Sequence, residues 1–170
     1  MRTLKEVDFS GKSVILRCDL NVPLDGEQIT DDGRIKASLP TIQFLLKAGA
    51  RITILAHLGR PKNGFENVFS LTPVAKRLSE LLKEPVTLAK DLVDLKSSAV
   101  ESQRVRMLEN IRFFPQETSK DEQERKAFAT ELSALGEIYV GDGFGAVHRK
   151  HASVFDLPKL LPHAAGTLVA

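Results

Sequence analysis

SVILRCDL, residues 13–20, is a short and mainly apolar stretch whose charged residues, Arg17 and Asp19, lie in its second half. Runs of this kind are typical of parallel strands that other elements cover on both faces. Similar runs occur at residues 51–58, 85–91, 105–111 and 137–142, and AAGTLVA at 164–170 is a further candidate. The sequence therefore predicts about six strands in one mainly parallel sheet.

Helical spacing occupies the segments between these runs. Apolar residues repeat every three or four positions at Ile35, Leu39, Ile42 and Leu46, and again within residues 74–82 and 128–135. Alternation of strands and helices places crossover helices on both faces of a parallel sheet. We therefore predict an open, three-layer α/β/α fold of the Rossmann-like kind, and the length favours one domain over residues 1–170.

Glycine and proline mark where the expected helices begin and end. Thr72 followed by Pro73 is typical of an N-cap and a first helical residue, and Gly49 and Gly136 suit left-handed C-terminal caps. Because proline lacks a backbone N–H, Pro40 predicts that the first helix begins near it or bends there.

Two polar segments have simple structural interpretations. VPLDGEQI at 22–29 is typical of a small hairpin with Asp25 and Gly26 at its turn. KDEQERK at 120–126 is typical of the solvent-facing side of a helix.

Composition narrows the classes of function. The 24 Lys and Arg residues nearly balance the 22 Asp and Glu residues, which favours neither a nucleic-acid partner nor a membrane surface. Cys18 is the only cysteine, so it forms no internal disulfide, and its apolar surroundings favour a core residue over a nucleophile. The first residues lack a signal peptide, and no run approaches the ~18 apolar residues of a membrane span. We expect a soluble, cytoplasmic protein.

Charged residues gather where the predicted strands end, which is the edge where open α/β sheets bind ligands. The residues that the pattern places there are Arg17, Asp19, Asn21, Arg34, His57, Arg60, Arg112, Asp142, His148 and Arg149. The arginines at 51, 77, 104, 106 and 125 instead precede strands or lie within helices, which indicates a surface role. Arginines and histidines at one edge would repel one another unless an anion lay among them, and guanidinium groups suit phosphate or carboxylate. The sequence predicts a small, anionic and hydroxylated ligand.

Each member of this set alone has a structural alternative. Asp19 could be a turn residue or a partner of Arg17, and His57 could be a strand-end histidine bonded to the backbone. Arg60 could lie on the surface, and Arg112 could form an ion pair with Glu109. Their convergence on one edge favours a functional site.

Gly141, Gly143 and Ala146 match a dinucleotide-binding pattern after a predicted strand. However, no acidic residue lies ~20 positions further on, and His148 and Arg149 interrupt the expected helix. We therefore interpret these glycines as a tight turn that brings polar side chains to the edge of the sheet. A dinucleotide module remains an alternative that predicts NAD binding.

Five ordered segments resemble the amino-terminal domain of phosphoglycerate kinase. They are RCDLNVP at 17–23, DDGRIKASLP at 31–40, AHLGRP at 56–61, MLENIRFFPQE at 107–117 and GDGFGAVHRKHAS at 141–153. The resemblance implies a cytoplasmic, monomeric glycolytic enzyme that transfers a phosphoryl group between 1,3-bisphosphoglycerate and ADP, or between ATP and 3-phosphoglycerate.

The resemblance also implies a role for each residue of the edge. His57, Arg60, Arg112 and Arg149 would bind the 3-phosphate and neighbouring groups, supported by Arg17 and His148. Asp19 and Asn21 would hold the 2-hydroxyl end, and Arg34 would be the catalytic arginine. The accepting carboxylate is already ionised at neutral pH, so the chemistry needs alignment and charge neutralisation rather than a general base.

Members of the family are about twice as long as this chain, and their second domain binds Mg-ATP or Mg-ADP. This chain has no G-x-x-x-x-G-K-[ST] loop. We therefore expect the substrate half of a two-domain kinase, without turnover by itself. The alternative is a free-standing anion-binding or regulatory module that has lost catalysis.

Overall fold

The computed structural model describes residues 2–62, 64–143 and 149–168. Seven strands of these residues form one sheet in the order β1-β9-β8-β2-β5-β7-β6, in which every pair is parallel. Their bounds are β1 (Arg2–Thr3), β2 (Ser13–Cys18), β5 (Arg51–Leu55), β6 (Thr87–Ala89), β7 (Val105–Leu108), β8 (Ile138–Asp142) and β9 (His163–Ala165). The predicted open parallel sheet is confirmed.

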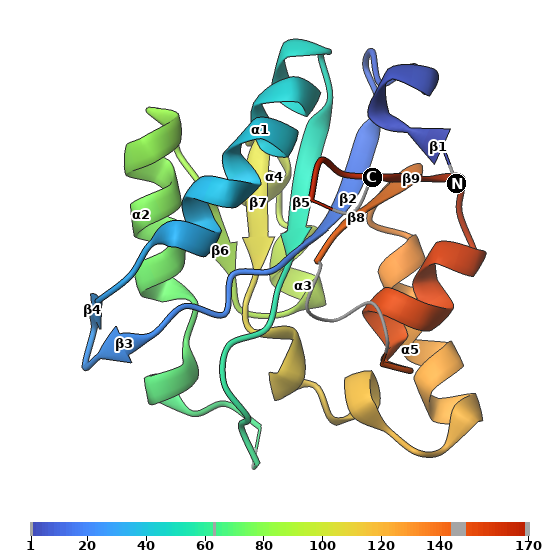
Figure 1. Cartoon of the computed structure of the whole chain (residues 1–170). Coiled ribbons are helices and arrows are strands. Elements are labelled where there is room, and N and C mark those ends of the chain that lie inside the picture. The colour runs from blue at the N-terminus through green and yellow to red at the C-terminus, as the bar shows by residue number, and fades with distance from the viewer. Residues whose placement is uncertain (1, 63, 144–148, 169–170) are drawn as a thin grey trace.

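Helices cover both faces of this sheet. The α-helices are α1 (Gly33–Lys47), α2 (Thr72–Leu82), α3 (Leu92–Leu95), α4 (Ser98–Glu101) and α5 (Glu122–Ser133). Shorter 3₁₀ or π turns are η1 (Leu4–Glu6), η2 (Asn67–Phe69), η3 (Ile111–Phe113), η4 (Pro115–Thr118), η6 (Ala152–Asp156) and η7 (Leu157–Lys159). Figure 1 shows α1 in front of the sheet. Each of these helices is too short or too polar to cross a membrane, within the residues that the structure describes.

The sheet separates two apolar cores. On one face, Ile42 of α1 and Leu78 of α2 pack with Leu16, Ile54 and other inward side chains of the central strands. On the other face, the second core joins α3, α4, α5 and η6 to the strands, and it includes Ile15, Leu55, Leu108, Phe128, Leu132, Tyr139 and Leu157. Alternate residues of one strand therefore face opposite cores, as expected for a strand that is buried on both sides.

The connections create a switch point at β2. From β2 the chain passes through α1 to β5 on one side, and it later returns as β8 on the other side. At the carboxyl end of β2, Arg17 lies opposite Leu55 of β5, and Cys18 lies opposite Asp142 of β8. Open sheets bind ligands beyond such a point, because the loops diverge there and leave a crevice.

Two strands differ from the expectation. The last one covers His163–Ala165 rather than 164–170, and the chain adds β1 as an edge strand beyond it. Strand β1 has only two residues, Arg2 and Thr3, and these are too few to show an apolar pattern from which a strand could be predicted. The hairpin is confirmed, since β3 (Leu24–Asp25) and β4 (Gln28–Ile29) pair antiparallel and Gly26 has φ +62°.

The helix boundaries confirm one predicted cap and correct two. Gly49 has φ +89° just beyond α1, as a left-handed cap requires. Gly136 lacks a positive φ, and an added Cβ there would lie 2.8 Å from Cγ1 of Ile15, so close packing against β2 explains this glycine. Thr72 is the first residue of α2 rather than its N-cap; its backbone N–H donates to Oγ of Ser70 at 3.2 Å.

Two further expectations concern proline and buried charge. Pro40 lies inside α1 on an exposed position, seven residues after the helix begins, so the helix does not start at it. The segment 120–126 is not uniformly solvent-facing, because Arg125 is buried and its Nε donates to Asp156 of η6 at 2.5 Å. Arg106 is also buried, and Nη2 donates to Thr53 at 2.6 Å, so the predicted surface role is wrong for both arginines.

Candidate functional site

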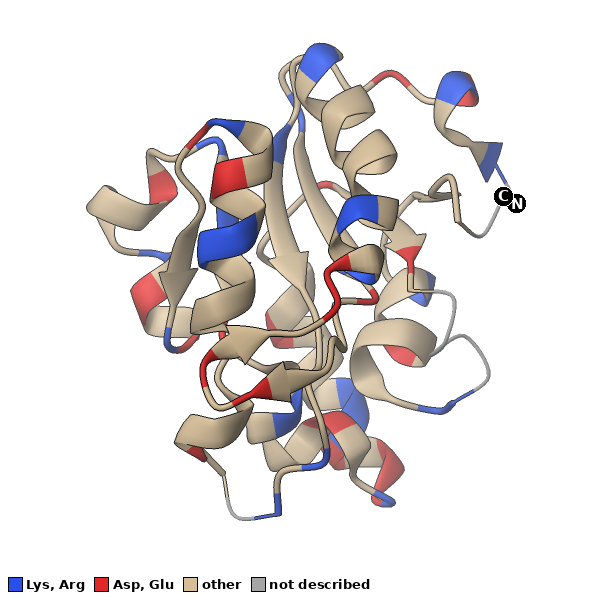
Figure 2. Cartoon of the chain, turned by 60° about the vertical axis from the view of Figure 1, so that its left-hand side comes forward, with Lys and Arg blue, Asp and Glu red and all other residues tan. Residues whose placement is uncertain are grey.

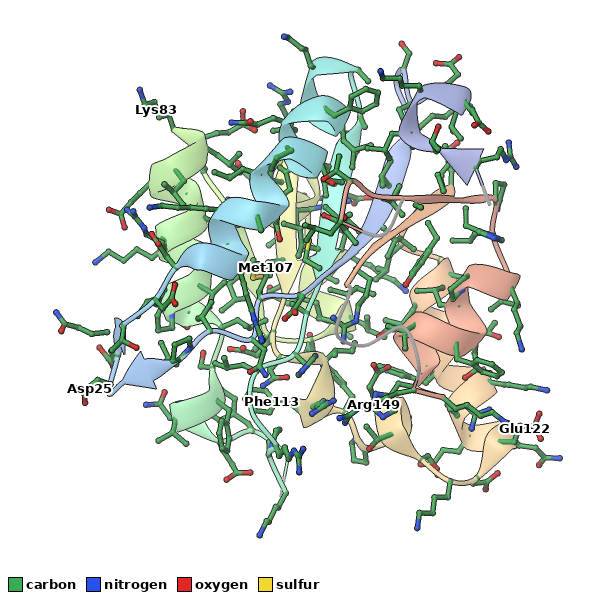
Figure 3. The ribbon with its side chains drawn as sticks, viewed as in Figure 1. Asp25, Lys83, Met107, Phe113, Glu122 and Arg149 are labelled. Carbon is green, nitrogen blue, oxygen red and sulfur yellow. The ribbon has the colours of Figure 1, made fainter. Side chains whose placement is uncertain are left out.

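A cavity of about 250 Å³ lies at the carboxyl edge of the sheet. Its lining consists of Asp19, Asn21, Arg34, His57, Gly59, Arg60, Arg112 and Arg149. Figure 3 labels Arg149 and Phe113 toward the end of the molecule to which the strand arrows point in Figure 1, with Lys83 at the opposite end. The seven side chains predicted as binding residues therefore meet at one cavity, and four of them are arginines.

A larger surface groove has a different character. It measures about 680 Å³ between the β3-β4 hairpin and α2, and both acidic and basic side chains line it. Arg77 there already binds Asp32, with Nη2 at 2.9 Å from Oδ2. Figure 2 shows the same mixing of charges over much of the molecule. The smaller cavity is thus distinguished by its excess of cationic groups rather than by size.

Hydrogen bonds between side chains and the backbone hold the strand-end loops of the cavity together. Oδ1 of Asn21 accepts the backbone N–H of Gly59 at 2.9 Å, and the carbonyl of Gly59 accepts Nη1 of Arg112 at 3.1 Å. Behind them, the side-chain amide of Asn110 donates to the carbonyls of Leu58 and Phe69, at 2.7 and 3.0 Å. Loops from three different strands are therefore fixed to one another before any ligand binds.

Arg34 is the most loosely held of the cationic groups for which the structure gives contacts. Nη1 donates to Oδ1 of Asp19 at 3.3 Å and to the carbonyl of Asn21 at 2.8 Å, while 54% of its side chain is exposed. It lies in the first turn of α1, shortly after the hairpin, so its long side chain projects from a helix end. This arginine can exchange its internal contacts for a ligand at small cost, since exposed ion pairs contribute little.

Arg17 supports the cavity from behind. It is 1% exposed, and its three donating nitrogens reach three partners: Nε to Oγ of Ser153 at 2.9 Å, Nη1 to the carbonyl of Cys18 at 2.7 Å, and Nη2 to Nδ1 of His57 at 3.1 Å. The predicted alternative, a contact of Arg17 with Asp19, is replaced by these bonds. Arginine cannot accept a hydrogen bond, so Nδ1 of His57 accepts and its ring proton lies on Nε2.

Burial and cationic neighbours set the protonation of two histidines. Burial, followed by Arg17 and Arg112, lowers the pKa of His57 to about 2. Burial and Arg112 similarly lower the pKa of His151, just beyond Arg149, to about 4. His57 is therefore a neutral hydrogen-bond donor at this site rather than a positive charge, which corrects its predicted place in a basic patch.

The contacts of Glu109 and Asp142 correct two further predictions. Glu109 accepts hydrogen bonds from Ser70 Oγ and from the backbone N–H of Leu71, both at 2.7 Å. It therefore binds the residues just before α2 and does not form the predicted ion pair with Arg112. Asp142 is buried and accepts the backbone N–H of Leu168 at 2.8 Å; it holds the end of the described chain rather than the crevice. Burial raises the pKa of the Cys18 thiol, consistent with a core residue.

Sequence reasoning missed the groups that support the site without lining it. These are Asn110, Glu117 and Ser153, with Gly59 as a lining residue. All four lie within the segments that resemble the family, so this resemblance was the available signal, but their hydrogen-bond partners are far apart in sequence. His148, predicted to support the cavity, lies outside the described residues.

Comparisons with known proteins agree with this architecture. The family model for "Phosphoglycerate kinase" matches residues 4–170. The phosphoglycerate kinases of Leifsonia xyli and Streptomyces coelicolor are 54% and 55% identical to this chain over its full length, which corresponds to 43% and 44% of theirs. The structure of the Pyrococcus horikoshii enzyme superposes with a TM-score of 0.87 at 31% identity, covering 99% of this chain and 43% of that one.

The Coxiella burnetii phosphoglycerate kinase gives a TM-score of 0.85 at 38% identity, over 98% of this chain and 41% of its own. The chain thus spans less than half the length of the relatives it matches. The match of the family model to nearly the whole chain shows that this chain belongs to the phosphoglycerate kinase family.

Proposed function

We propose that this chain is the 3-phosphoglycerate-binding domain of a phosphoglycerate kinase. The observation that carries the proposal is the cavity lined by Arg34, Arg60, Arg112 and Arg149 together with a carboxylate and an amide. Its volume of about 250 Å³ suits a three-carbon phosphorylated acid, and paired guanidinium donors match phosphate and carboxylate oxygens. Mg-ATP or Mg-ADP would be bound by the remaining half of the full-length enzyme.

We assign to the lining residues the roles that the family resemblance implies. Arg60, Arg112 and Arg149, with Nε2–H of His57, would bind the 3-phosphate. Asp19 and Asn21 would bind the 2-hydroxyl end. Their arrangement supports this assignment because the Asn21 amide is already fixed to Gly59, which leaves its NH₂ group for the ligand.

Arg34 would act on the transferred phosphoryl group. The attacking 3-phosphoglycerate carboxylate needs no base, so catalysis depends on alignment and on neutralising the charge of the transferred oxygens. The exposed, weakly paired guanidinium of Arg34 could move from Asp19 onto these oxygens as the reaction proceeds. Its charge persists at every working pH.

The test is an amide NMR titration of the chain with 3-phosphoglycerate, with sulfate as the nonspecific anion. We expect saturable shifts at the cavity residues and weaker binding of sulfate. Arg60→Met should weaken 3-phosphoglycerate binding roughly ten- to hundredfold, because it removes charge-assisted hydrogen bonds. Arg104→Met is the matched control, since this exposed arginine pairs with Glu84 at the other end of the sheet.

Equal affinity for sulfate and 3-phosphoglycerate would contradict the proposal and favour the alternative of a general anion-binding module. Saturable binding of NAD would instead favour the dinucleotide alternative. We expect no ATP-dependent acyl-phosphate formation by the chain alone, which a coupled assay measures.

A further inference from the structure

Three buried, hydrogen-bonded polar side chains lie behind the cavity, and the proposed chemistry does not explain why they are there. Glu117 of η4, Ser153 of η6 and Arg17 of β2 are 0, 0 and 1% exposed. Oε1 of Glu117 accepts the backbone N–H of Ser153 at 2.8 Å, and Oε2 accepts the Ser153 hydroxyl at 2.5 Å. The same hydroxyl oxygen accepts Nε of Arg17 at 2.9 Å. Glu117 thus contacts Arg17 through one intervening hydroxyl.

While Glu117 is ionised, each hydrogen bond among Glu117, Ser153, Arg17 and His57 can have only one donor. Ser153 has one hydroxyl proton, which goes to Glu117, so its oxygen is free to accept from Arg17. Arg17 can only donate, so Nδ1 of His57 must accept. The carbonyl of Ser153 accepts the Tyr139 hydroxyl at 2.8 Å, which fixes this residue from a third side. The proton on Nε2 of His57 is therefore set by the Nη2 donor of Arg17, and Ser153 and Glu117 fix the position of that guanidinium.

We propose that Glu117 is a positioning residue for the phosphate site: through Ser153 it holds the guanidinium of Arg17, which keeps the His57 ring as the Nε2–H tautomer facing the cavity. This inference rests on the proposed function, because it assigns Nε2–H as a donor to the 3-phosphate. A buried carboxylate is unexpected behind an anion-binding cavity, because it would repel the anion. The positioning role explains why Glu117 lies there. Without Glu117, no anionic group would be connected to the buried Arg17 charge through these hydrogen bonds.

The protonation of Glu117 offers an independent readout. Burial raises its pKa to about 7, against the opposing effect of Arg17. The charged and titratable groups facing it are Arg17 from β2, Arg112 from η3 and Tyr139 from β8. The arginines stay charged and the pKa of Tyr139 is raised, so Glu117 is the member of this group that titrates near neutrality.

The experiment uses the full 170-residue chain at pH 8 and long-range ¹H–¹⁵N correlation spectra of the His57 ring, with and without 3-phosphoglycerate. We expect pure Nε2–H tautomer in the parent chain. Glu117→Gln replaces one of the two accepting oxygens with an NH₂ group, which faces a Ser153 donor, so both tautomers should appear and 3-phosphoglycerate should bind roughly tenfold more weakly. Lowering the pH through about 7 should move the parent spectrum toward that of E117Q, whose spectrum should not change.

Ser153→Ala is the second variant, because it removes the connecting hydroxyl with little change in volume; it should reproduce both effects. Glu131→Gln, an exposed carboxylate on α5, is the matched control and should change neither. An unchanged His57 tautomer and unchanged affinity in a folded E117Q or S153A chain overturns the inference. Absence of 3-phosphoglycerate binding in the parent chain would instead overturn the proposed function, and the ligand-free tautomer spectra distinguish the two results.

Discussion

His57 shows how a single residue at this site departs from its ordinary chemistry. Because burial and the neighbouring guanidinium groups lower its pKa to about 2, the ring should remain neutral between pH 5 and 8. We expect its ¹³C and ¹⁵N ring shifts to reach no imidazolium values over this range in the folded chain, so that the tautomer change linked to Glu117 is the only change of the ring. In urea the same ring should titrate near its ordinary value of about 6.5. A midpoint near 6 in the folded chain would show that His57 becomes a cation.

Glu117 should make stability depend on pH with the opposite sign from an ordinary carboxylate. Its pKa is about 7 in the folded chain and ordinary, near 4.5, when unfolded. Between these values the folded state binds more protons, so the free energy of unfolding from this group is highest at low pH and falls as pH rises toward 7. Denaturant titrations of E117Q should lose this component, whereas E131Q should retain it. An identical pH profile in the parent and E117Q chains would contradict the raised pKa.

At the scale of elements, the two glycines beyond helices should respond differently to substitution. Gly49→Ala should cost about 1 kcal/mol of unfolding free energy, because φ +89° disfavours any side chain, and Gly49→Asn should cost less, since asparagine tolerates left-handed backbone. Gly136→Ala and Gly136→Asn should both destabilise more, by about 1–3 kcal/mol, because their Cβ would press on β2. Urea unfolding measures all four. Recovery of stability by asparagine at Gly136 would contradict the packing explanation.

The elements that sequence reasoning identified are those whose signal is local. Strands such as β2 and β5 are continuous apolar runs, and α2 repeats apolar residues at helical spacing, so no tertiary information is needed to predict them. The role of Gly136 could not be found this way, because it depends on where β2 passes. Likewise, the buried state of Arg125 depends on Asp156, which lies 31 residues later.

At the scale of the whole molecule, the parallel sheet explains why the lining of the site was predictable. Residues that follow parallel strands share an edge, so Asn21, His57 and Arg112 meet although they are far apart in sequence. The supporting groups follow no strand in the same way: Glu117 and Ser153 reach the site through η4 and η6, whose path the sequence does not specify. Roles that need a ligand, above all that of Arg34, stay predictions.

Ligand binding at this edge should stabilise the entire chain, because the cavity joins loops from β2, β5 and β7 with Arg149 beyond β8. A ligand that binds only the folded state adds about 2.7 kcal/mol at a concentration one hundred times its dissociation constant, so 3-phosphoglycerate should raise the melting temperature by several degrees. Glycerate, which lacks the phosphate, should raise it far less, since it leaves most of the guanidinium donors unpaired. The increase should shrink as salt rises from low to moderate concentration, because three of the four lining arginines are exposed to solvent and salt screens such charges. Equal stabilisation by glycerate and 3-phosphoglycerate in thermal melts would mean that the arginines do not select for phosphate.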